Sequence, residues 1–230
     1  DRWPVSVVPS IGVYAQLAAT ARPAAPVRDV LLVGNPASPV DPYGAGLGVR
    51  HLPPLVHAER EVNGIAAGYR CGPPLIGPAA TRRAVLDALP TCDLAHFATH
   101  GILGSQTAVM PGALCLTPTA DDDGYLRVDD LVDLRLPRCR LVVLSACRSG
   151  WGRSSAEGTL GLARTLLAVG VRSVVVSLWP IYDNAAADFM IGFHAGVRAG
   201  VPVDEALRRQ MVATRAAGAP IVDWAAFTVV

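Results

Sequence analysis

The stretch that decides the fold is Asp93-Leu94-Ala95-His96-Phe97-Ala98-Thr99-His100-Gly101, a short apolar run that closes with histidine and glycine. Such a run, bounded by polar and turn residues, predicts a strand that is buried on both faces. His100 lies just past the strand end, where an imidazole can reach solvent and a neighbouring loop. Gly101 lets the backbone approach a ligand closely. His96 lies within the strand and is interpreted as a packed histidine.

A second apolar run, Leu141 to Ser145, is followed by Cys147 in a loop rich in serine and glycine. A thiol beside an imidazole can lose its proton and become a nucleophile. If the two strands are neighbours, His100 and Cys147 meet at one edge, and the N–H groups of Gly101 and Cys147 can receive an oxyanion. His100 precedes Cys147 by 47 residues, close to the roughly 50 residues of the caspase signature.

The rest of the chain alternates apolar strands with amphipathic helices. A lone cysteine after a strand is usually core filling, so the surrounding pattern matters. The strands are apolar on both faces, which predicts an α/β sandwich: a mostly parallel sheet with helices on both faces. We expect a single domain over residues 1–230. Predicted strands are 30–33, 93–99, 141–145, 173–178 and 225–230; predicted helices are 55–69, 81–89, 157–169, 183–200 and one from 202; residues 113–128 form a hairpin.

Composition narrows the class of protein. The chain has 230 residues, 51% of them hydrophobic, and a net charge of +1. It has no basic stretch, which argues against nucleic-acid binding, and no apolar run long enough to cross a membrane. Its five cysteines are odd in number and include no C-x-x-C pair, so a reducing, cytoplasmic location is expected. The chain starts at Asp1, which suggests the C-terminal part of a longer protein.

The ordered motifs resemble those of CHAT domains, caspase-like modules often attached to tetratricopeptide repeats, with separases, caspases and metacaspases as more distant relatives. The set spans nearly the whole chain, and its order is more specific than any single motif. The matching segments are Val8-Pro9-Ser10, Leu32-Val33-Gly34-Asn35-Pro36, Ala79-Ala80-Thr81, His96-Phe97-Ala98-Thr99-His100-Gly101, Leu144-Ser145-Ala146-Cys147 with Gly150, Ser177-Leu178-Trp179-Pro180 with Asp183, and Trp224-Ala225-Ala226-Phe227.

The resemblance implies a cysteine endopeptidase with a His100–Cys147 dyad and no metal or organic cofactor. It also implies a protein substrate, regulated proteolysis in a bacterium, and an upstream repeat or sensor region as activator. By analogy with separases, Asp183 would line the pocket for the residue before the cut and favour arginine or lysine there. The commoner family pattern has an acidic residue where Tyr182 stands, so substrate preference stays open.

Competing interpretations remain at several positions. Asp183 or Asn184 is also well placed to cap the helix that follows it. The domain could be a catalytically silent interaction or scaffold module, or a thiol hydrolase acting on small acyl substrates. Asp121 to Asp123 are expected in a solvated turn, because they lack EF-hand spacing. His51, His57 and His194 are expected at the surface, and the cysteines other than Cys147 as inert fillers or loop residues.

Overall fold

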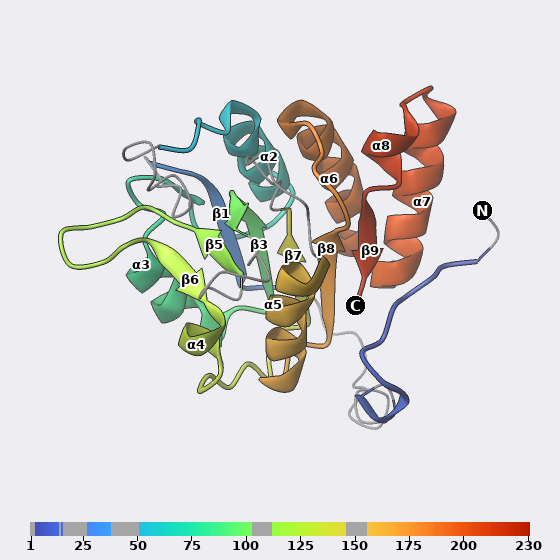
Figure 1. Ribbon diagram of the computed structural model, residues 1–230. Helices are drawn as coiled ribbons and strands as arrows, with labels where there is room; N and C mark the ends of the chain where they lie inside the picture. Colours follow the sequence, from blue (N-terminus) through green and yellow to red (C-terminus); the bar gives the residue numbers. More distant parts are fainter. Residues whose placement is uncertain (1–2, 14, 16–26, 38–50, 103–111, 146–155) are drawn as a thin grey trace.

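The computed structural model describes residues 3–13, 15, 27–37, 51–102, 112–145 and 156–230, with side chains described from 161 onward in the last range. A six-stranded sheet runs through the molecule in the order β2-β1-β3-β7-β8-β9 (Figure 1). All neighbouring strands are parallel except β9, which is antiparallel to β8. The strands are β1 (Val30–Pro36), β2 (Leu75–Gly77), β3 (Leu94–Ala98), β7 (Leu141–Leu144), β8 (Ser173–Ser177) and β9 (Phe227–Val229).

Helices cover both faces of this sheet, as the alternation of elements predicted. One face packs against α3 (Arg82–Ala88), α4 (Val128–Leu131) and α5 (Ala156–Ala168). The other packs against α2 (Val56–Ala66), α6 (Asp183–Arg198) and α7 (Val203–Ala216), which lie side by side behind the sheet in Figure 1. Two further helices are short, η1 (Leu89–Thr91) and α8 (Ile221–Trp224). The predicted α/β sandwich is therefore confirmed.

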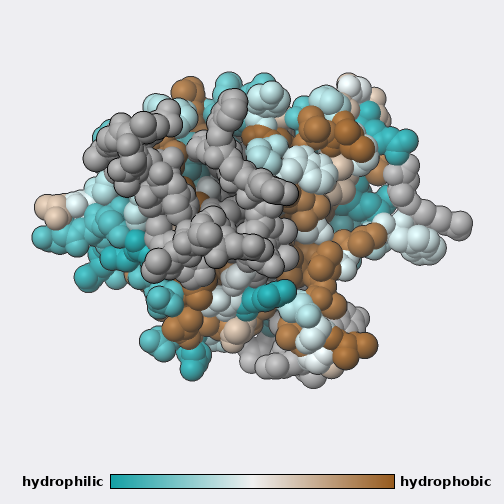
Figure 2. Space-filling model, viewed as in Figure 1, coloured by the Kyte–Doolittle hydropathy of each residue, from teal (hydrophilic) through white to brown (hydrophobic). Residues whose placement is uncertain are grey.

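After β3 the chain leaves the main sheet and enters a small antiparallel one. This sheet has the order β4 (Gly101–Ile102), β5 (Ala113–Cys115) and β6 (Tyr125–Arg127). The hairpin predicted over residues 113–128 is its β5–β6 pair. Hydrophilic side chains gather over the region of this hairpin and α3 in Figure 2. The acidic turn, Asp121 to Asp123, was expected to be solvated. It also forms an ion pair, because Asp122 lies 2.7 Å from Arg82.

Several local signals of the sequence act as predicted. The Thr81 hydroxyl accepts the Ala84 N–H at 3.2 Å and so caps α3. Gly170 has φ 113 and ends the helix before it. β1 is longer than predicted, because β2 supplies partners as far as Pro36. Sequence inspection missed β2 itself, which is three residues long between proline and glycine residues.

Gly34 explains one of the motifs that the sequence brought forward. A methyl group on this residue would lie 2.9 Å from Val62 Cγ2 and 3.0 Å from the Ala58 carbonyl oxygen, so β1 and α2 approach closely here. The next residue, Asn35, has φ 45, and its side-chain oxygen accepts the Leu55 N–H at 2.9 Å. Gly34 thus allows α2 to lie close to β1, and Asn35, at an irregularity in the pairing of β1 with β2, holds the entry to α2 in place.

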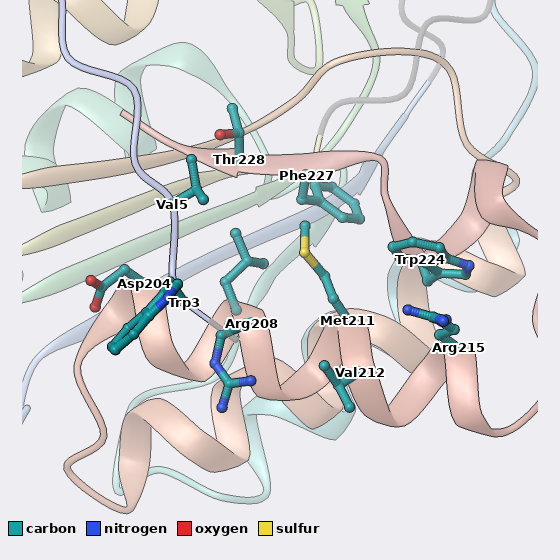
Figure 3. Close-up of a pocket in the computed structure, with 11 residues that line it drawn as sticks. Trp3, Val5, Asp204, Arg208, Met211, Val212, Arg215, Trp224, Phe227 and Thr228 are labelled. Atoms are coloured by element: carbon teal, nitrogen blue, oxygen red, sulfur yellow. The ribbon is translucent and has the colours of Figure 1, made fainter. Parts of the chain in front are cut away.

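The segment from Trp3 crosses the outer edge of the sheet at β9. Ser6 forms a parallel bridge with Val229, and the Val7 N–H donates to the Val229 carbonyl at 2.8 Å. Between this segment, α7 and Phe227 lies a cavity of about 240 Å³ (Figure 3). Within the described residues, no helix is long and apolar enough to cross a lipid bilayer.

Candidate active site

The two strands that precede the predicted dyad are hydrogen-bonded neighbours. β3 and β7 pair in parallel register, with His96 opposite Val143 and Phe97 opposite Leu144. His100 and Ser145 therefore lie at the same, carboxyl edge of the sheet, where ligands bind in open α/β folds. Cys147 and Gly150 lie outside the described residues, as do Arg148 and Trp151, which neighbour Cys147 in the sequence. The structure thus fulfils the condition on which the predicted meeting of the two side chains depends.

His100 is buried, and one of its ring nitrogens is fixed by a backbone carbonyl. Its Nε2 lies 2.7 Å from the Pro53 carbonyl oxygen. A carbonyl can only accept, so Nε2 carries the proton, and Nδ1 is the basic nitrogen of the neutral ring. Burial lowers the pKa of His100, which the bond to Pro53 and the negative charge of Asp183 partly offset. The imidazole is consequently held in its neutral form at physiological pH.

Gly101 begins the small antiparallel sheet directly beside this histidine. The Cys115 N–H donates to the His100 carbonyl at 2.8 Å, and Gly101 stands opposite Leu114. Hydrogen-bonded and non-hydrogen-bonded pairs alternate along an antiparallel ladder. The Gly101 N–H therefore faces away from β5, the orientation that a donor to a reacting carbonyl oxygen at this edge requires.

Asp183 is half-buried at the start of α6, and its carboxylate bonds to a different helix. Its Oδ2 accepts the His57 N–H at 2.7 Å, in the first turn of α2. The prediction that Asp183 or Asn184 caps the following helix is wrong, because Tyr182 occupies the N-cap of α6 without a side-chain bond. The helix dipole of α2 explains the contact, since its first N–H groups attract a carboxylate. Asp183 still influences the site, because its charge raises the pKa of His100.

Beneath the strand ends lies a buried chain of polar side chains between the sheet, α2 and α6. His96 Nε2 is 2.8 Å from Glu61 Oε1, and His96 Nδ1 is 3.1 Å from His194 Nε2. The Tyr69 hydroxyl lies 3.3 Å from His194 Nδ1 and donates to the His194 carbonyl at 3.5 Å. The packed role predicted for His96 is confirmed.

Two predictions from the sequence are wrong for these buried polar side chains. The helical spacing of the apolar residues from Leu55 to Tyr69 predicts that Glu61 lies on the outer side of its helix, with Glu59 and Arg60. In the structure Glu61 is 1% exposed. His194 was expected at the surface and is 2% exposed. Each is polar at a position that faces the sheet, and hydrophobic periodicity gives no signal for a buried polar side chain. A helical spacing of Ala58, Glu61, Val62 and Ile65 could have placed Glu61 on the inner face.

The protonation states of these hydrogen-bonded side chains follow from their burial. Burial raises the pKa of Glu61 to about 8, with Ser145 lowering it and Asp183 raising it. Burial lowers the pKa of His96 to about 3, and burial followed by the proximity of His96 lowers that of His194 well below its usual value. At neutral pH, protonated Glu61 therefore donates to His96, which donates to His194, which donates to Tyr69. Ionisation of Glu61 reverses the direction of all three bonds.

Ser145 connects the polar chain to the carboxyl edge of the sheet. It is 4% exposed, and its hydroxyl forms no regular hydrogen bond with any residue that the structure describes. Its effect on the pKa of Glu61 places it within electrostatic reach of that carboxyl group. Ser145 precedes Cys147 by two residues, so the polar chain ends next to the segment that carries the predicted nucleophile.

The remaining candidate residues are inert or lie elsewhere. Cys92, Cys115 and Cys139 are buried, Cys71 is half-buried, and none of the four forms a disulfide with another described residue. Cys92 contacts Cys139 at 3.9 Å between sulfur atoms, and that contact raises the pKa of its thiol. His51 and His57 are exposed, as predicted. Among the described residues, no three histidine, cysteine or acidic side chains gather in a group suited to a metal ion.

Comparison with solved structures identifies the fold. The Arg-specific cysteine proteinase gingipain R superposes with a TM-score of 0.52 at 12% identity, over 88% of this chain and 46% of that one. A complex of the pro- and mature domains of RgpB from Porphyromonas gingivalis gives a TM-score of 0.52 at 13% identity, over 88% and 47%. At this level of identity the likeness concerns the fold, which is that of the caspase-like cysteine proteinases.

The family follows from the sequence comparison. The CHAT domain model matches residues 2–230, and the chain belongs to the CHAT domain family. Tetratricopeptide repeat protein 28 of Mus musculus is 30% identical over 213 residues, and its Homo sapiens counterpart is 28% identical over 217 residues. Each alignment covers 77% of this chain but only 8% of the relative, so the chain spans a small part of those proteins.

Proposed function

We propose that this domain is a cysteine endopeptidase that cuts a protein partner, with His100 as general base and Cys147 as nucleophile. The observation that carries the proposal is the fixed imidazole at the end of β3. Its Nε2 donates to the Pro53 carbonyl oxygen at 2.7 Å, which leaves Nδ1 as the base. The strand adjacent to β3 is β7, and Cys147 follows β7 in the sequence. Membership of the CHAT family and the caspase-like fold support the same assignment.

The proposed reaction has two stages, acylation of Cys147 and hydrolysis of the thioester. His100 Nδ1 takes the thiol proton as Cys147 sulfur attacks the carbonyl carbon, and the N–H groups of Gly101 and Cys147 bind the oxyanion. His100 then returns the proton to the amine, the C–N bond breaks, and a thioester remains. Water, deprotonated by the same imidazole, attacks the thioester and releases the acid and the thiol. No metal or organic cofactor takes part.

Buried His100 sets the expected pH dependence of this reaction. Its lowered pKa keeps the imidazole unprotonated at and above the usual histidine value of 6.5. We expect kcat/KM to stay level between pH 6.5 and neutrality and to fall below pH 6.5, as His100 takes up a proton. A pH series with one fluorogenic peptide measures this. An acid limb centred above pH 6.5 would contradict the role of a desolvated base.

The dyad is tested by paired variants and a probe. Incubation with a peptide pool of varied residues before the cut should give cleavage that Cys147→Ala abolishes and His100→Ala lowers by about 10³-fold or more. His51→Ala, at an exposed histidine, is the matched control and should retain full activity. Cleavage that survives Cys147→Ala defeats the proposal. Labelling of Cys147 by an acylating probe without any cleavage favours the silent scaffold module instead.

Asp183 is proposed to favour arginine or lysine before the cut. Its charge reaches His100, and the solved neighbour gingipain R is described as Arg-specific. Its bond to the His57 N–H offers the competing, structural role. Asp183→Asn retains an oxygen acceptor for that N–H but removes the charge, so it separates the two. Selective loss of turnover after arginine or lysine at an unchanged melting temperature supports the pocket. Uniform loss in Asp183→Ala with a lower melting temperature supports only the structural bond to the His57 N–H.

We further propose that the domain forms the C-terminal part of a longer protein and is latent until an upstream repeat or sensor region acts on it. The curated relatives are tetratricopeptide repeat proteins, which supports a link of this kind. Adding the upstream region in trans should raise the rate of peptide cleavage by the isolated domain. An isolated domain that is already fully active would refute latency but leave the dyad untouched.

A further inference from the structure

A cavity opens at the opposite, amino-terminal edge of the sheet. Its volume is about 820 Å³, within the range of small-molecule sites. It lies where β3, β7 and β8 begin, against the C-terminal ends of α2 and α6. His100 follows the far end of β3, and a strand of this length separates the two edges by roughly 17–20 Å. The cavity is thus a separate place from the proposed active site.

Positive charge is concentrated around this cavity. Its lining includes five arginines in a chain that has 20 basic residues and a net charge of only +1. These arginines are Arg28, Arg70, Arg140, Arg172 and Arg198. They come from five separate segments, so no periodicity of a single helix or strand accounts for their grouping. Their convergence creates a field that attracts anions.

Asp93, the one carboxylate among the described lining residues, does not neutralise the cluster. Its Oδ2 accepts the N–H groups of Arg28 and Asp29 at 2.8 and 3.1 Å. Its Oδ1 lies 3.4 Å from Arg138, which does not line the cavity. These partners, after the opposing effect of burial, keep the pKa of Asp93 below its usual value. The carboxylate is therefore engaged by the protein itself.

Arg28, Arg70 and Arg198 can offer their positive charge to a ligand. Across the described part of the chain, no carboxylate forms an ion pair with Arg28, Arg70 or Arg198. Arg198 is held over Gly68, where a methyl group would fall 1.4 Å from its Nη1. A planar guanidinium with two parallel donors matches phosphate oxygens, and several around one cavity match more than one phosphate.

The walls of the cavity are apolar. Leu94 and Leu141, which are buried, and Tyr69 and Val201, which are half-buried, form part of the lining. A site with apolar walls and convergent charged groups suits a ligand that joins a flat or apolar part to anionic groups. Inorganic phosphate alone would leave these walls in contact with water.

From this arrangement we propose that the cavity binds a phosphate-bearing small molecule, with a nucleoside polyphosphate as its best chemical match. The phosphates contact the arginine rim, and the base lies against the half-buried Tyr69 and Val201. The site stands independently of the peptidase proposal, because binding needs neither His100 nor Cys147. It is measured on the intact chain carrying Cys147→Ala, so that hydrolysis cannot interfere.

Isothermal titration calorimetry with ATP, AMP, tripolyphosphate and adenosine tests the site. We expect saturable binding of ATP, weaker binding of AMP, and none of adenosine. The double variant Arg70→Gln/Arg198→Gln should weaken ATP binding by about tenfold or more, since two charge-assisted contacts are lost. Arg83→Gln is the matched control: it removes one exposed arginine, with 85% of its side chain accessible, from α3 on the other face of the sheet.

Gly68→Ala provides a test that changes no charge. The added methyl group must displace the Arg198 guanidinium, so ATP binding should weaken severalfold while the melting temperature of the unliganded protein holds. Tripolyphosphate binding as tightly as ATP would identify an inorganic polyphosphate as the natural form of the ligand and support the site. Equal affinity of the double variant for ATP, adenosine binding as well as ATP, or no saturable binding of ATP would overturn the proposal.

Discussion

On the face of the sheet that α3, α4 and α5 cover, the strands meet a continuous apolar cluster that includes Phe97, Val142 and Leu166. Among the described residues of that cluster, no histidine or charged side chain is buried. On the opposite face, His96 of β3 meets Glu61 of α2 and His194 of α6 inside the core. Adjacent residues of β3 therefore point to opposite faces of the sheet. One face packs in the apolar cluster, and the other contributes to the row of buried polar side chains beneath the strand ends.

The largest effect should come from the apolar face. Phe97→Ala removes a side chain that is 2% exposed and leaves a cavity, at a cost of about 3–5 kcal/mol of unfolding free energy. Chemical denaturation of this variant and the parent measures it. Phe97→Leu, the milder control, should lose less than half as much. A loss below about 1 kcal/mol for alanine would mean that this face collapses around the gap and is not tightly packed.

The next effect should come from breaking the polar chain on the other face. His96→Leu removes the partner of Glu61 Oε1 and of His194 Nε2, and a buried group left without its partner costs about 1–3 kcal/mol. Removing both groups in Glu61→Met/His96→Leu should restore part of the loss, because no polar group at that contact is then left unpaired. A double-mutant cycle on unfolding free energies tests this. Additive losses would show that the two groups do not depend on each other.

The protonation of the chain should appear in the pH dependence of stability. The pKa of Glu61 is about 8 in the folded protein against an ordinary value near 4.3, so its contribution is lost as pH rises toward 8. The pKa values of His96 and His194 are lowered. The contribution of these two histidines to stability is therefore lost as pH falls below 6.5. Stability should therefore be greatest near pH 6.5 and decline by about 2 kcal/mol by pH 8.

Glu61→Gln is the control for that pH profile. It retains the shape of the side chain and a donor toward His96, but it cannot ionise. The decline between pH 6.5 and 8 should disappear in this variant, while the decline on the acid side remains. An alkaline decline that persists in Glu61→Gln would assign it to another group.

The smallest effects compare the two faces through a pair of glycines. Gly34→Ala should destabilise by about 1–2 kcal/mol, because its methyl group meets Val62 and Ala58 where α2 lies close to β1. Gly161→Ala, in α5 on the other face with no neighbour within 4 Å of the added carbon, should instead stabilise by about 0.5–1 kcal/mol. Thermal melting of both variants checks the opposite signs.

Much of the architecture was predictable from local patterns. Buried strands appear as short apolar runs, and the caps at Thr81 and Gly170 depend on residues within the same turn. The placement of His100 at a sheet edge follows from the same reasoning, and the pairing of β3 with β7 supports it. Whether Cys147 faces His100 stays a prediction, because that residue lies outside the described part of the chain.

The sequence by itself determined the alternation of strands and helices, and hence a mostly parallel sheet with His100 at its carboxyl edge. Only the tertiary structure decided which polar side chains lie inside and what they contact. Pro53 meets His100 from 47 residues away, and Asp183 meets His57 from 126 residues away. Periodicity reports which face of an element is apolar, whereas these contacts depend on how separate elements pack, and the five arginines converge for the same reason.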